Sequence, residues 1–247
     1  MAGNSVEQND DHANVVFTFG RFQPPTIGHK VLIDFISTTA ASLDADPYVF
    51  VSSSQNKIPQ KPKAVFESTK QNENPLSVYD KVSYLKKMYP ETSVRFINTT
   101  ECECTTIFKS IDVLKSAGYT GITMAVGSDR VESFQRILSK VGVTVIAAGD
   151  RVVNVDSTNA KAMSGTKMRQ AAVAGNVKKF TDGVMIGSMT EVDAMNLLNA
   201  VRAGLGYDPL VLGGSLNHKN NTRKGKKIRI KTRRMPKKYR LRLEERT

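Results

Sequence analysis

Two short segments, far apart in the chain, carry the residue types that bind phosphate. The first is Gly20-Arg21-Phe22-Gln23-Pro24-Pro25-Thr26-Ile27-Gly28-His29, and the second is Ser164-Gly165-Thr166-Lys167-Met168-Arg169. Each offers hydroxyl, imidazole or cationic groups where a helix is expected to begin. Backbone N–H groups at a helix N-terminus lack intrahelical partners and carry the positive end of the helix dipole. The two segments therefore favour an anionic ligand such as a phosphate group.

The first segment is predicted to be a turn between a strand and a helix. Residues 15–19 before it are an apolar run, which is typical of a buried parallel strand. Residues 30–39 after it place apolar side chains on one helical face. Gly20 permits the tight bend. Thr26 and His29 then fall at the first helical turn, beside the unpaired N–H groups.

The pattern of strands and helices predicts an α/β fold around these segments. Further apolar strands are expected at residues 48–51, 94–97, 121–126 and 143–146. Helices are expected at residues 78–89, 105–117, 166–174 and 191–203, and one passes through residues 134–138. In the helix at 78–89, Lys81, Lys86 and Lys87 are expected to face water. The alternation predicts a doubly wound, parallel, five-stranded Rossmann-like sheet with C-terminal helices and a disordered basic tail.

A third polar segment, Gly127-Ser128-Asp129-Arg130, ends the fourth predicted strand. In an open parallel sheet, ligands bind beyond the carboxyl ends of the strands, where the strand order reverses. Asp129 is thus either a ligand-binding residue or an ordinary helix start. The polar loop at residues 55–76 carries Lys57, Lys61 and Lys63, and no motif selects one of these for phosphate binding.

On these residues the sequence resembles the nucleotidyltransferase superfamily that is related to class I aminoacyl-tRNA synthetases. Gly20-Arg21-Phe22 followed by Thr26-Ile27-Gly28-His29 resembles its HIGH motif, in the form T/HxGH. The second segment is similar to its ISxTxxR signature, with Met163 in place of isoleucine. The resemblance covers roughly residues 15–180 and is to cytidylyltransferase-like and nicotinamide-mononucleotide adenylyltransferase-like members. Gly20-Arg21-Phe22-Gln23-Pro24 and Glu73-Asn74-Pro75-Leu76 look most like the second of these branches. Pro25 departs from the archaeal-type adenylyltransferases, which tend to have an aromatic residue there.

Within the superfamily, the sequence is most similar to the nucleotidyltransferase-like proteins of large tailed bacteriophages. The resemblance rests on the combination of residues 126–130 with residues 198–206. It implies a cytoplasmic protein, in the host cytoplasm if the protein is viral, with virion association as an alternative.

The resemblance implies transfer of AMP or CMP from ATP or CTP to a small phosphorylated acceptor, with release of pyrophosphate. Thr26, His29 and Arg169 would be the catalytic residues. Magnesium would be carried by the triphosphate rather than by protein ligands. Such transfer needs positioning and charge stabilisation more than a protein nucleophile, which suits these residue types. The residues implied to bind the nucleotide are Gly20, Arg21, Phe22, Gly28, Gly127, Asp129, Ser164, Gly165 and Thr166.

The charge of the chain is concentrated at its C-terminal end. Residues 217–247 hold 14 Lys or Arg and 2 Asp or Glu, whereas residues 1–216 hold 22 and 21. So many like charges with few apolar residues predict a disordered arm. Such an arm either stays solvated, binds nucleic acid nonspecifically through counterion release, or contacts a protein partner. An alternative function is therefore a nucleic-acid-binding or virion assembly protein on the same fold.

These patterns divide the chain into a leader at residues 1–14, an α/β domain at 15–180, a helical appendage at 181–216 and the basic tail at 217–247. The leader is polar and lacks the apolar core of a signal peptide. No apolar run approaches the roughly 20 residues that a membrane span needs. Cys102 and Cys104 are the two cysteines, and one intervening residue is too few for the usual zinc spacing. We expect reduced thiols.

Overall fold

The computed structural model describes residues 13–56, 74–149 and 163–211 of the chain. The predicted leader, the three loop lysines and the basic tail at 217–247 lie outside the described residues, apart from Ala13 and Asn14. The described residues up to Leu210 belong to one compact unit. None of the helices in the described part is long and apolar enough to cross a membrane.

The central sheet has five parallel strands and confirms the predicted architecture. Their order is β3-β2-β1-β4-β5, so the chain winds outward from β1 to β3 and then returns to place β4 beside β1. The strand order therefore reverses between β1 and β4. The predicted strands are all present, with β2 beginning three residues earlier than its apolar run. The strands are β1 (Asn14–Gly20), β2 (Ala45–Val51), β3 (Arg95–Asn98), β4 (Gly121–Val126) and β5 (Val143–Ala147).

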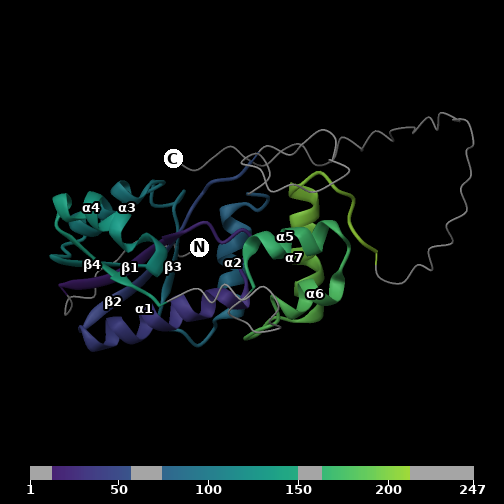
Figure 1. Cartoon of the computed structure of the whole chain (residues 1–247), viewed down its shortest axis with the longest axis horizontal. Coiled ribbons are helices and arrows are strands. Elements are labelled where there is room, and N and C mark those ends of the chain that lie inside the picture. Colours follow the sequence, from purple (N-terminus) through teal and green to yellow (C-terminus); the bar gives the residue numbers. More distant parts are fainter. Residues whose placement is uncertain (1–12, 57–73, 150–162, 212–247) are drawn as a thin grey trace, which may run out of the picture. The chain divides into compact units, whose positions relative to one another are not determined.

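The helices connect and cover these strands, and Figure 1 shows α3 and α4 on one side of the sheet with α1 on the other. Each predicted helix is present with ends within a few residues. The short helix α6 was not predicted. The helices are η1 (Ile27–His29), α1 (Lys30–Ser42), α2 (Val78–Met88), α3 (Ile107–Ser116), η2 (Ser128–Arg130), α4 (Val131–Leu138), η3 (Ser139–Val141), α5 (Gly165–Val173), α6 (Val177–Asp182) and α7 (Glu191–Gly204).

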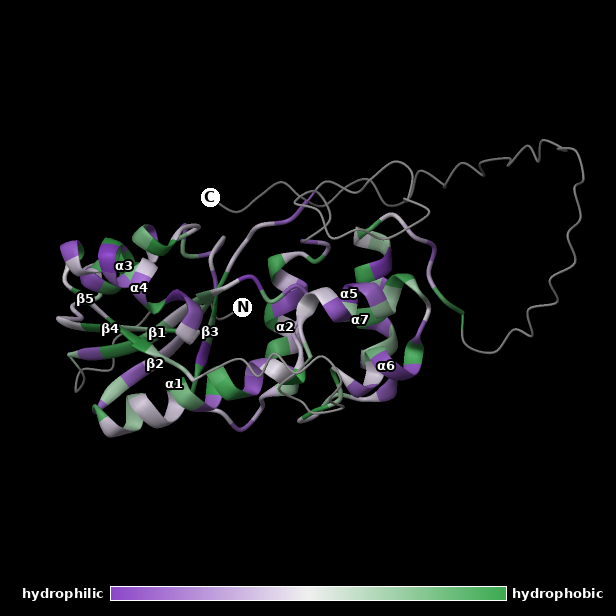
Figure 2. Ribbon diagram, in the orientation of Figure 1, coloured by the Kyte–Doolittle hydropathy of each residue, from purple (hydrophilic) through white to green (hydrophobic). Residues whose placement is uncertain are grey.

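The sheet buries a separate apolar core on each face. Successive residues of a strand point to opposite faces, so Val15 and Val16 enter different cores. One core contains side chains of α3 and α4, including Leu114 and Leu138. The other contains side chains of α1 and α2, including Ile36. Figure 2 shows apolar and polar residues alternating along α1 and α2, as expected for helices with one buried side.

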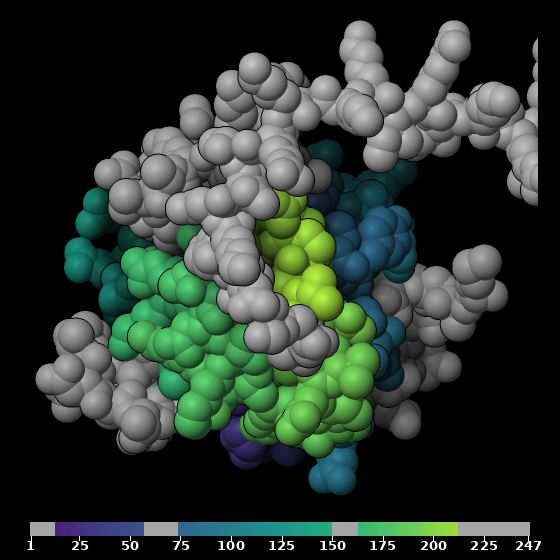
Figure 3. Space-filling model, turned by 90° about the vertical axis from the view of Figure 1, so that its right-hand side faces the viewer, coloured from purple at the N-terminus to yellow at the C-terminus, as the bar shows by residue number. Residues whose placement is uncertain are grey.

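The three C-terminal helices extend the core that α2 occupies. Met168 of α5, Phe180 of α6 and Leu198 of α7 are fully buried in the same cluster as Leu85 of α2. Figure 3 shows these helices (green to yellow) against the blue segment that contains α2. The helix that carries the second of the two segments, Ser164 to Arg169, is therefore held by the α2 side of the sheet domain.

Arg202 of α7 holds the carboxyl end of α5. Its Nη1 donates hydrogen bonds to the carbonyl oxygens of Ala172 (2.7 Å) and Val173 (3.1 Å). The last carbonyls of a helix lack intrahelical partners and carry partial negative charge, so a buried guanidinium satisfies them. This contact fixes one end of the helix whose other end is Gly165.

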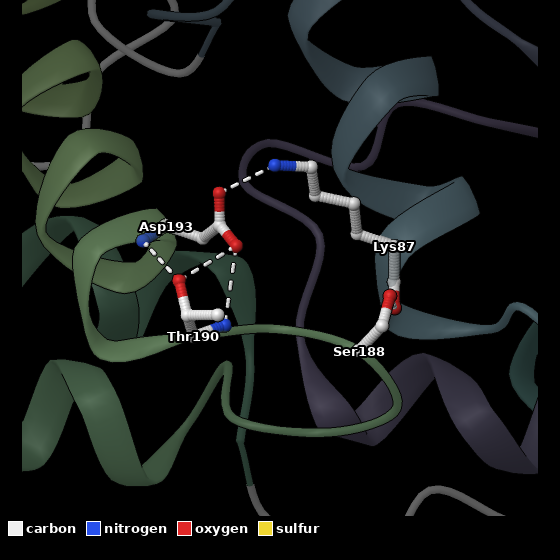
Figure 4. Close-up of polar contacts among 4 residues, drawn as sticks. All are labelled: Lys87, Ser188, Thr190 and Asp193. Atoms are coloured by element: carbon white, nitrogen blue, oxygen red, sulfur yellow. Dashed lines mark hydrogen bonds and ion pairs between the residues drawn. The ribbon is translucent and has the colours of Figure 1, made fainter.

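A polar bridge joins α2 to the start of α7 (Figure 4). Lys87 of α2 forms a 2.5 Å ion pair with Asp193, and its carbonyl accepts hydrogen bonds from Ser188 N and Oγ, both 2.9 Å. Asp193 also accepts hydrogen bonds from Thr190 N (3.1 Å) and Thr190 Oγ1 (2.8 Å). The same carboxylate thus caps α7 and ties it to α2.

The prediction of two free thiols was wrong, because the structure joins Cys102 and Cys104 in a disulfide. The chain after β3 forms a tight turn in which Cys102 N donates to Asn98 O and Glu103 adopts a positive φ of 53°. This turn brings the two cysteine Cα atoms to 5.2 Å, within the range that a disulfide needs.

Candidate active site at the carboxyl edge of the sheet

The first segment forms a tight turn that places the ring of Phe22 under that of His29. Phe22 adopts a positive φ of 48°, and its ring centroid lies 4.8 Å from the imidazole. A Cβ on Gly20 would lie 2.4 Å from the Phe22 ring, so this packing requires glycine at the end of β1. The ring supports the imidazole from the buried side, because Phe22 is only 3% exposed.

A hydrogen bond fixes the orientation of His29. Its Nδ1 accepts from the backbone N–H of Thr26 at 3.0 Å and lies 3.1 Å from the Thr26 hydroxyl. Because Nδ1 accepts, the proton of the neutral ring resides on Nε2. The imidazole is half-buried. His29 can thus present an N–H donor at the start of α1, where the helix dipole also favours an anion.

Two residues that the sequence did not identify hold this turn in place. The hydroxyl of Tyr89, at the end of α2, donates to the carbonyl of Thr26 at 2.9 Å. The backbone N–H of Ile27 donates to the carbonyl of Gly183, just after α6, at 3.0 Å. Burial raises the pKa of Tyr89, so the hydroxyl keeps its proton as a donor. The signal for Tyr89 was its place in the buried stripe of α2, because a buried tyrosine hydroxyl needs a partner.

The second segment begins α5 and contacts the first segment directly. Ser164 is the N-cap, and its Oγ accepts from Lys167 N at 3.3 Å. Just before it, the carbonyl of Met163 accepts a 3.1 Å hydrogen bond from the hydroxyl of Thr26. The two segments thus meet although 137 positions separate Thr26 from Met163.

Arg169 makes a second direct link. Its Nη1 donates to the carbonyl of Gln23 at 2.6 Å, and its Nη2 donates to the hydroxyl of Thr166 at 3.2 Å. The side chain is buried, with Arg169 only 5% exposed. A Cβ on Gly165 would lie 2.7 Å from the same Gln23 carbonyl oxygen. Glycine at the first position of α5 therefore lets the helix approach the first turn closely.

Gln23 fastens the first turn to the neighbouring loops. Its Nε2 donates to the carbonyls of Ser54 (3.2 Å) and Leu76 (2.9 Å), and its Oε1 accepts from Leu76 N at 2.9 Å. The residue is 5% exposed. A buried amide with these partners acts as a crosslink, since each unpaired polar group would carry a desolvation cost. Gln23 was not among the predicted site residues, although it lies within the first segment.

Lys81 was predicted to face water and is instead fully buried. Its ammonium donates to the carbonyl of Ser52, the residue that follows β2. Ser52 N in turn donates to the carbonyl of Gly20 at 2.9 Å. The helical pattern failed here because this side chain, in the first turn of α2, reaches the main-chain carbonyl that follows β2 instead of solvent.

The other predicted site residues lie at the same edge but have fewer contacts. Arg21 is exposed, and Gly28 and Gly127 are half-buried in their turns. The side chain of Asp129 is 63% exposed and lies 3.8 Å from Arg130 Nε. Within the described residues, no hydrogen bond links Asp129 to either of the two segments. The turn after β4 therefore stands beside the two joined segments without being part of their network.

The arrangement gathers donors from two helix starts at the point where the strand order reverses. It offers the imidazole of His29, the hydroxyls of Ser164 and Thr166, and the guanidinium of Arg169. Ser164 is exposed, and Thr166 is half-buried. Donors of these types, beside unpaired N–H groups, suit a ligand with several phosphate groups.

Comparisons with known proteins place this geometry in context. A family model described as cytidylyltransferase-like matches residues 17–171, a range that begins in β1 and ends in α5. A search of curated proteins found no match. Among solved structures, the chain is similar to Plasmodium falciparum nicotinic acid mononucleotide adenylyltransferase complexed with NaAD. That match has 13% sequence identity and a TM-score of 0.46, and it covers 78% of this chain and 98% of the other.

Proposed function

Because this chain belongs to the cytidylyltransferase-like family, we propose that it transfers a nucleoside monophosphate from a triphosphate to a phosphorylated acceptor. The nucleotide would be ATP or CTP, and the products would be the nucleotidylated acceptor and pyrophosphate. An oxygen of the acceptor phosphate would attack the α-phosphorus. The bond from that phosphorus to the β-phosphate oxygen would break, and pyrophosphate would leave with the electron pair.

The observation that supports this proposal most is the direct contact between the two segments. Arg169 reaches the carbonyl of Gln23 at 2.6 Å, and Thr26 reaches the carbonyl of Met163 at 3.1 Å. Donors that were distant in the sequence are therefore positioned together. Nucleotidyl transfer gains most from fixed donors aimed at developing negative charge, which is what such an arrangement provides.

Each residue has a distinct role in the proposed reaction. His29 would donate from Nε2 to the α-phosphate as charge builds on it, and Thr26 would hold the ring that does so. Ser164, Thr166 and Arg169 would bind the β- and γ-phosphates that become pyrophosphate. None of these side chains needs to form a covalent intermediate.

Mg²⁺ would enter the site bound to the phosphates of the triphosphate. In the described part of the chain, no cluster of three His, Cys, Asp or Glu side chains could hold a metal ion. Mg²⁺ keeps several waters and commonly binds through substrate phosphates with few protein ligands, so a site made of donors is compatible with it. When bound, it would neutralise part of the negative charge of the triphosphate.

The test is a screen for pyrophosphate release with purified protein, Mg²⁺ and each of four nucleoside triphosphates. The acceptors are nicotinamide mononucleotide, pantetheine phosphate, phosphocholine, glycerol phosphate and FMN. The proposal expects one pair of substrates to give release well above the rate with either substrate alone. If every combination stays at background, the proposal is wrong.

The basic segment at residues 217–247 supports a second candidate function. With 14 Lys or Arg against 2 Asp or Glu, we propose that it binds nucleic acid nonspecifically. Binding should weaken steeply as salt is added and should be lost when these residues are deleted. Unchanged binding after deletion would contradict the proposal. The narrower resemblance to bacteriophage proteins, and with it virion association, stays a prediction.

A further inference from the structure

The buried ammonium of Lys81 stands directly behind the first turn of the candidate site. Lys81 is 0% exposed, and its Nζ donates to the carbonyl of Ser52. One hydrogen bond further on, Ser52 N contacts the carbonyl of Gly20. Among the described residues, no carboxylate forms an ion pair with Lys81. The chain thus buries a positive charge at the carboxyl edge of β2, close to the proposed phosphate site.

Within the described ranges, the charges around this ammonium do not compensate it. Burial, together with the nearby positive charge of Arg21 on the first turn, lowers the pKa of Lys81 to about 8. On α2 itself, Asp80 is exposed and accepts a 2.6 Å hydrogen bond from Ser77, while Tyr84 has a raised pKa and stays neutral. After the end of β2, Ser52 supplies its main-chain carbonyl, and its side chain is not ionisable.

A buried ammonium without a negatively charged partner is costly, and it is unusual for lysine. An anion bound over Gly20 and Arg21 would supply the missing negative charge. Lys81 is too deeply buried to touch such a ligand, so its effect would be through space and through the position of the Ser52 carbonyl. In the partly desolvated edge of the sheet, such an interaction is screened less than in water.

We propose that Lys81 is a positioning residue that raises the affinity of the site for the triphosphate by placing a fixed positive charge behind the Gly20–Arg21 turn. This inference rests on the proposed function, because it assumes that phosphates bind over that turn. It predicts that the protonated form of Lys81 binds the triphosphate more tightly than the neutral form. Affinity should therefore fall as pH rises through the pKa of this group.

The test measures binding of ATP and of CTP by calorimetry from about pH 7.5 to about pH 9.5, where the phosphate groups of a nucleoside triphosphate are already ionised. Wild type is compared with Lys81→Met, which removes the charge, and Lys81→Arg, which keeps it at all these pH values. Lys86→Met, an exposed lysine on the same helix, is the control for loss of one positive charge.

We expect Lys81→Met to bind on the order of tenfold more weakly at the lower pH, with little further change as pH rises. Wild type should lose about the same factor across the range, while Lys81→Arg should not. Lys86→Met should follow wild type. A Lys81→Met variant that keeps the wild-type affinity or the wild-type pH dependence would overturn the inference, because a purely structural lysine would leave that dependence unchanged.

A second measurement, made on wild type alone, tests the inference if Lys81→Met does not fold. Nitrogen-15 NMR titration of the Lys81 ammonium in wild type should show its pKa rise when ATP or CTP binds, and an unchanged pKa with both would overturn the inference. If wild type binds no triphosphate at all, the proposed function fails together with the inference. If wild type binds and only the effects of Lys81 are missing, the proposed function stands and the role of Lys81 does not.

Discussion

The guanidinium of Arg169 donates a 2.6 Å hydrogen bond to the main-chain carbonyl of Gln23, which lies 146 positions earlier in the chain. Gln23 is part of the turn that carries Thr26 and His29, and Arg169 is part of α5, the helix that Ser164 caps. The bond therefore sets the distance between the two groups of donors.

Replacing Arg169 should lower kcat/KM more than it lowers the free energy of unfolding. Arg169→Lys keeps the charge but cannot reach both the Gln23 carbonyl and the Thr166 hydroxyl, since an ammonium lacks the planar fork of a guanidinium. We expect kcat/KM to fall by about 10²-fold or more, in line with the loss of one transition-state donor. Arg136→Lys, at an exposed position on α4, is the control. Wild-type kcat/KM in Arg169→Lys would contradict the assigned role.

Gly165→Ala tests whether the close approach of α5 matters. The new Cβ would lie 2.7 Å from the Gln23 carbonyl oxygen, so the helix start must move away. A displacement of about 1 Å can cost on the order of 10²-fold in rate, and we expect a loss of that size. Steady-state kinetics measure it, with Gln170→Ala on the exposed side of α5 as the control. Full activity in Gly165→Ala would show that the spacing is not critical.

The free protein should become more stable as pH rises into the alkaline range, because the buried ammonium of Lys81 then loses its proton. Its pKa is about 8 in the folded chain and 10.5 ordinarily, so between these values the unfolded chain binds more protons. Stability then rises with pH, and the cost of burying the charge, fully present below pH 8, is relieved towards pH 10.5. The shift corresponds to about 3 kcal/mol. Urea unfolding across this pH range measures the free energy of unfolding of wild type and of Lys81→Met. The difference between the two should change by about 3 kcal/mol with pH. A constant difference would contradict the prediction.

Asp193 should have the opposite dependence at acid pH. Its hydrogen bonds and ion pair with Lys87 and Thr190 lower its pKa from 3.8 to about 2 (Figure 4). A carboxylate with a lowered pKa stabilises the fold above its ordinary pKa, and this contribution disappears as pH falls through 2. Thermal unfolding of wild type and Asp193→Asn should differ at neutral pH and converge towards pH 2. Asp112→Asn, on the exposed side of α3, should show no such convergence.

The sequence predicted most of the fold because its signals were local. The apolar runs marked all five strands, and helical spacing of apolar residues marked the main helices. The short helix α6 was not predicted because its six residues, Val177–Asp182, span less than two helical turns. The disulfide was not predicted because the close approach of Cys102 and Cys104 depends on a turn with a positive φ at Glu103.

The candidate site was predicted in its parts but not in its connections. Thr26, His29, Ser164 and Arg169 could be selected from residue type and helix position. Their contacts depend on packing between distant segments, which no local pattern encodes. Lys81 shows the limit most clearly, because a lysine on the polar side of a helix normally faces water, and only the position of Ser52 reveals its burial.

The most direct test of the whole account is the kinetics of two substitutions at His29. Asparagine can replace the Nδ1 acceptor that binds Thr26 N, but it has no group at Nε2, whereas glutamine can place a donor near Nε2 and cannot accept from Thr26 in the same way. Thr38→Ala, an exposed change further along α1, is the control.

With the substrate pair that gives pyrophosphate release, His29→Asn should fold with nearly wild-type stability and lose about 10²- to 10³-fold in kcat. His29→Gln should keep more activity than His29→Asn while being less stable to urea, because it leaves the Thr26 N–H without its acceptor. His29→Asn with wild-type kcat would contradict the claim that Nε2 of His29 acts on the transferred phosphate.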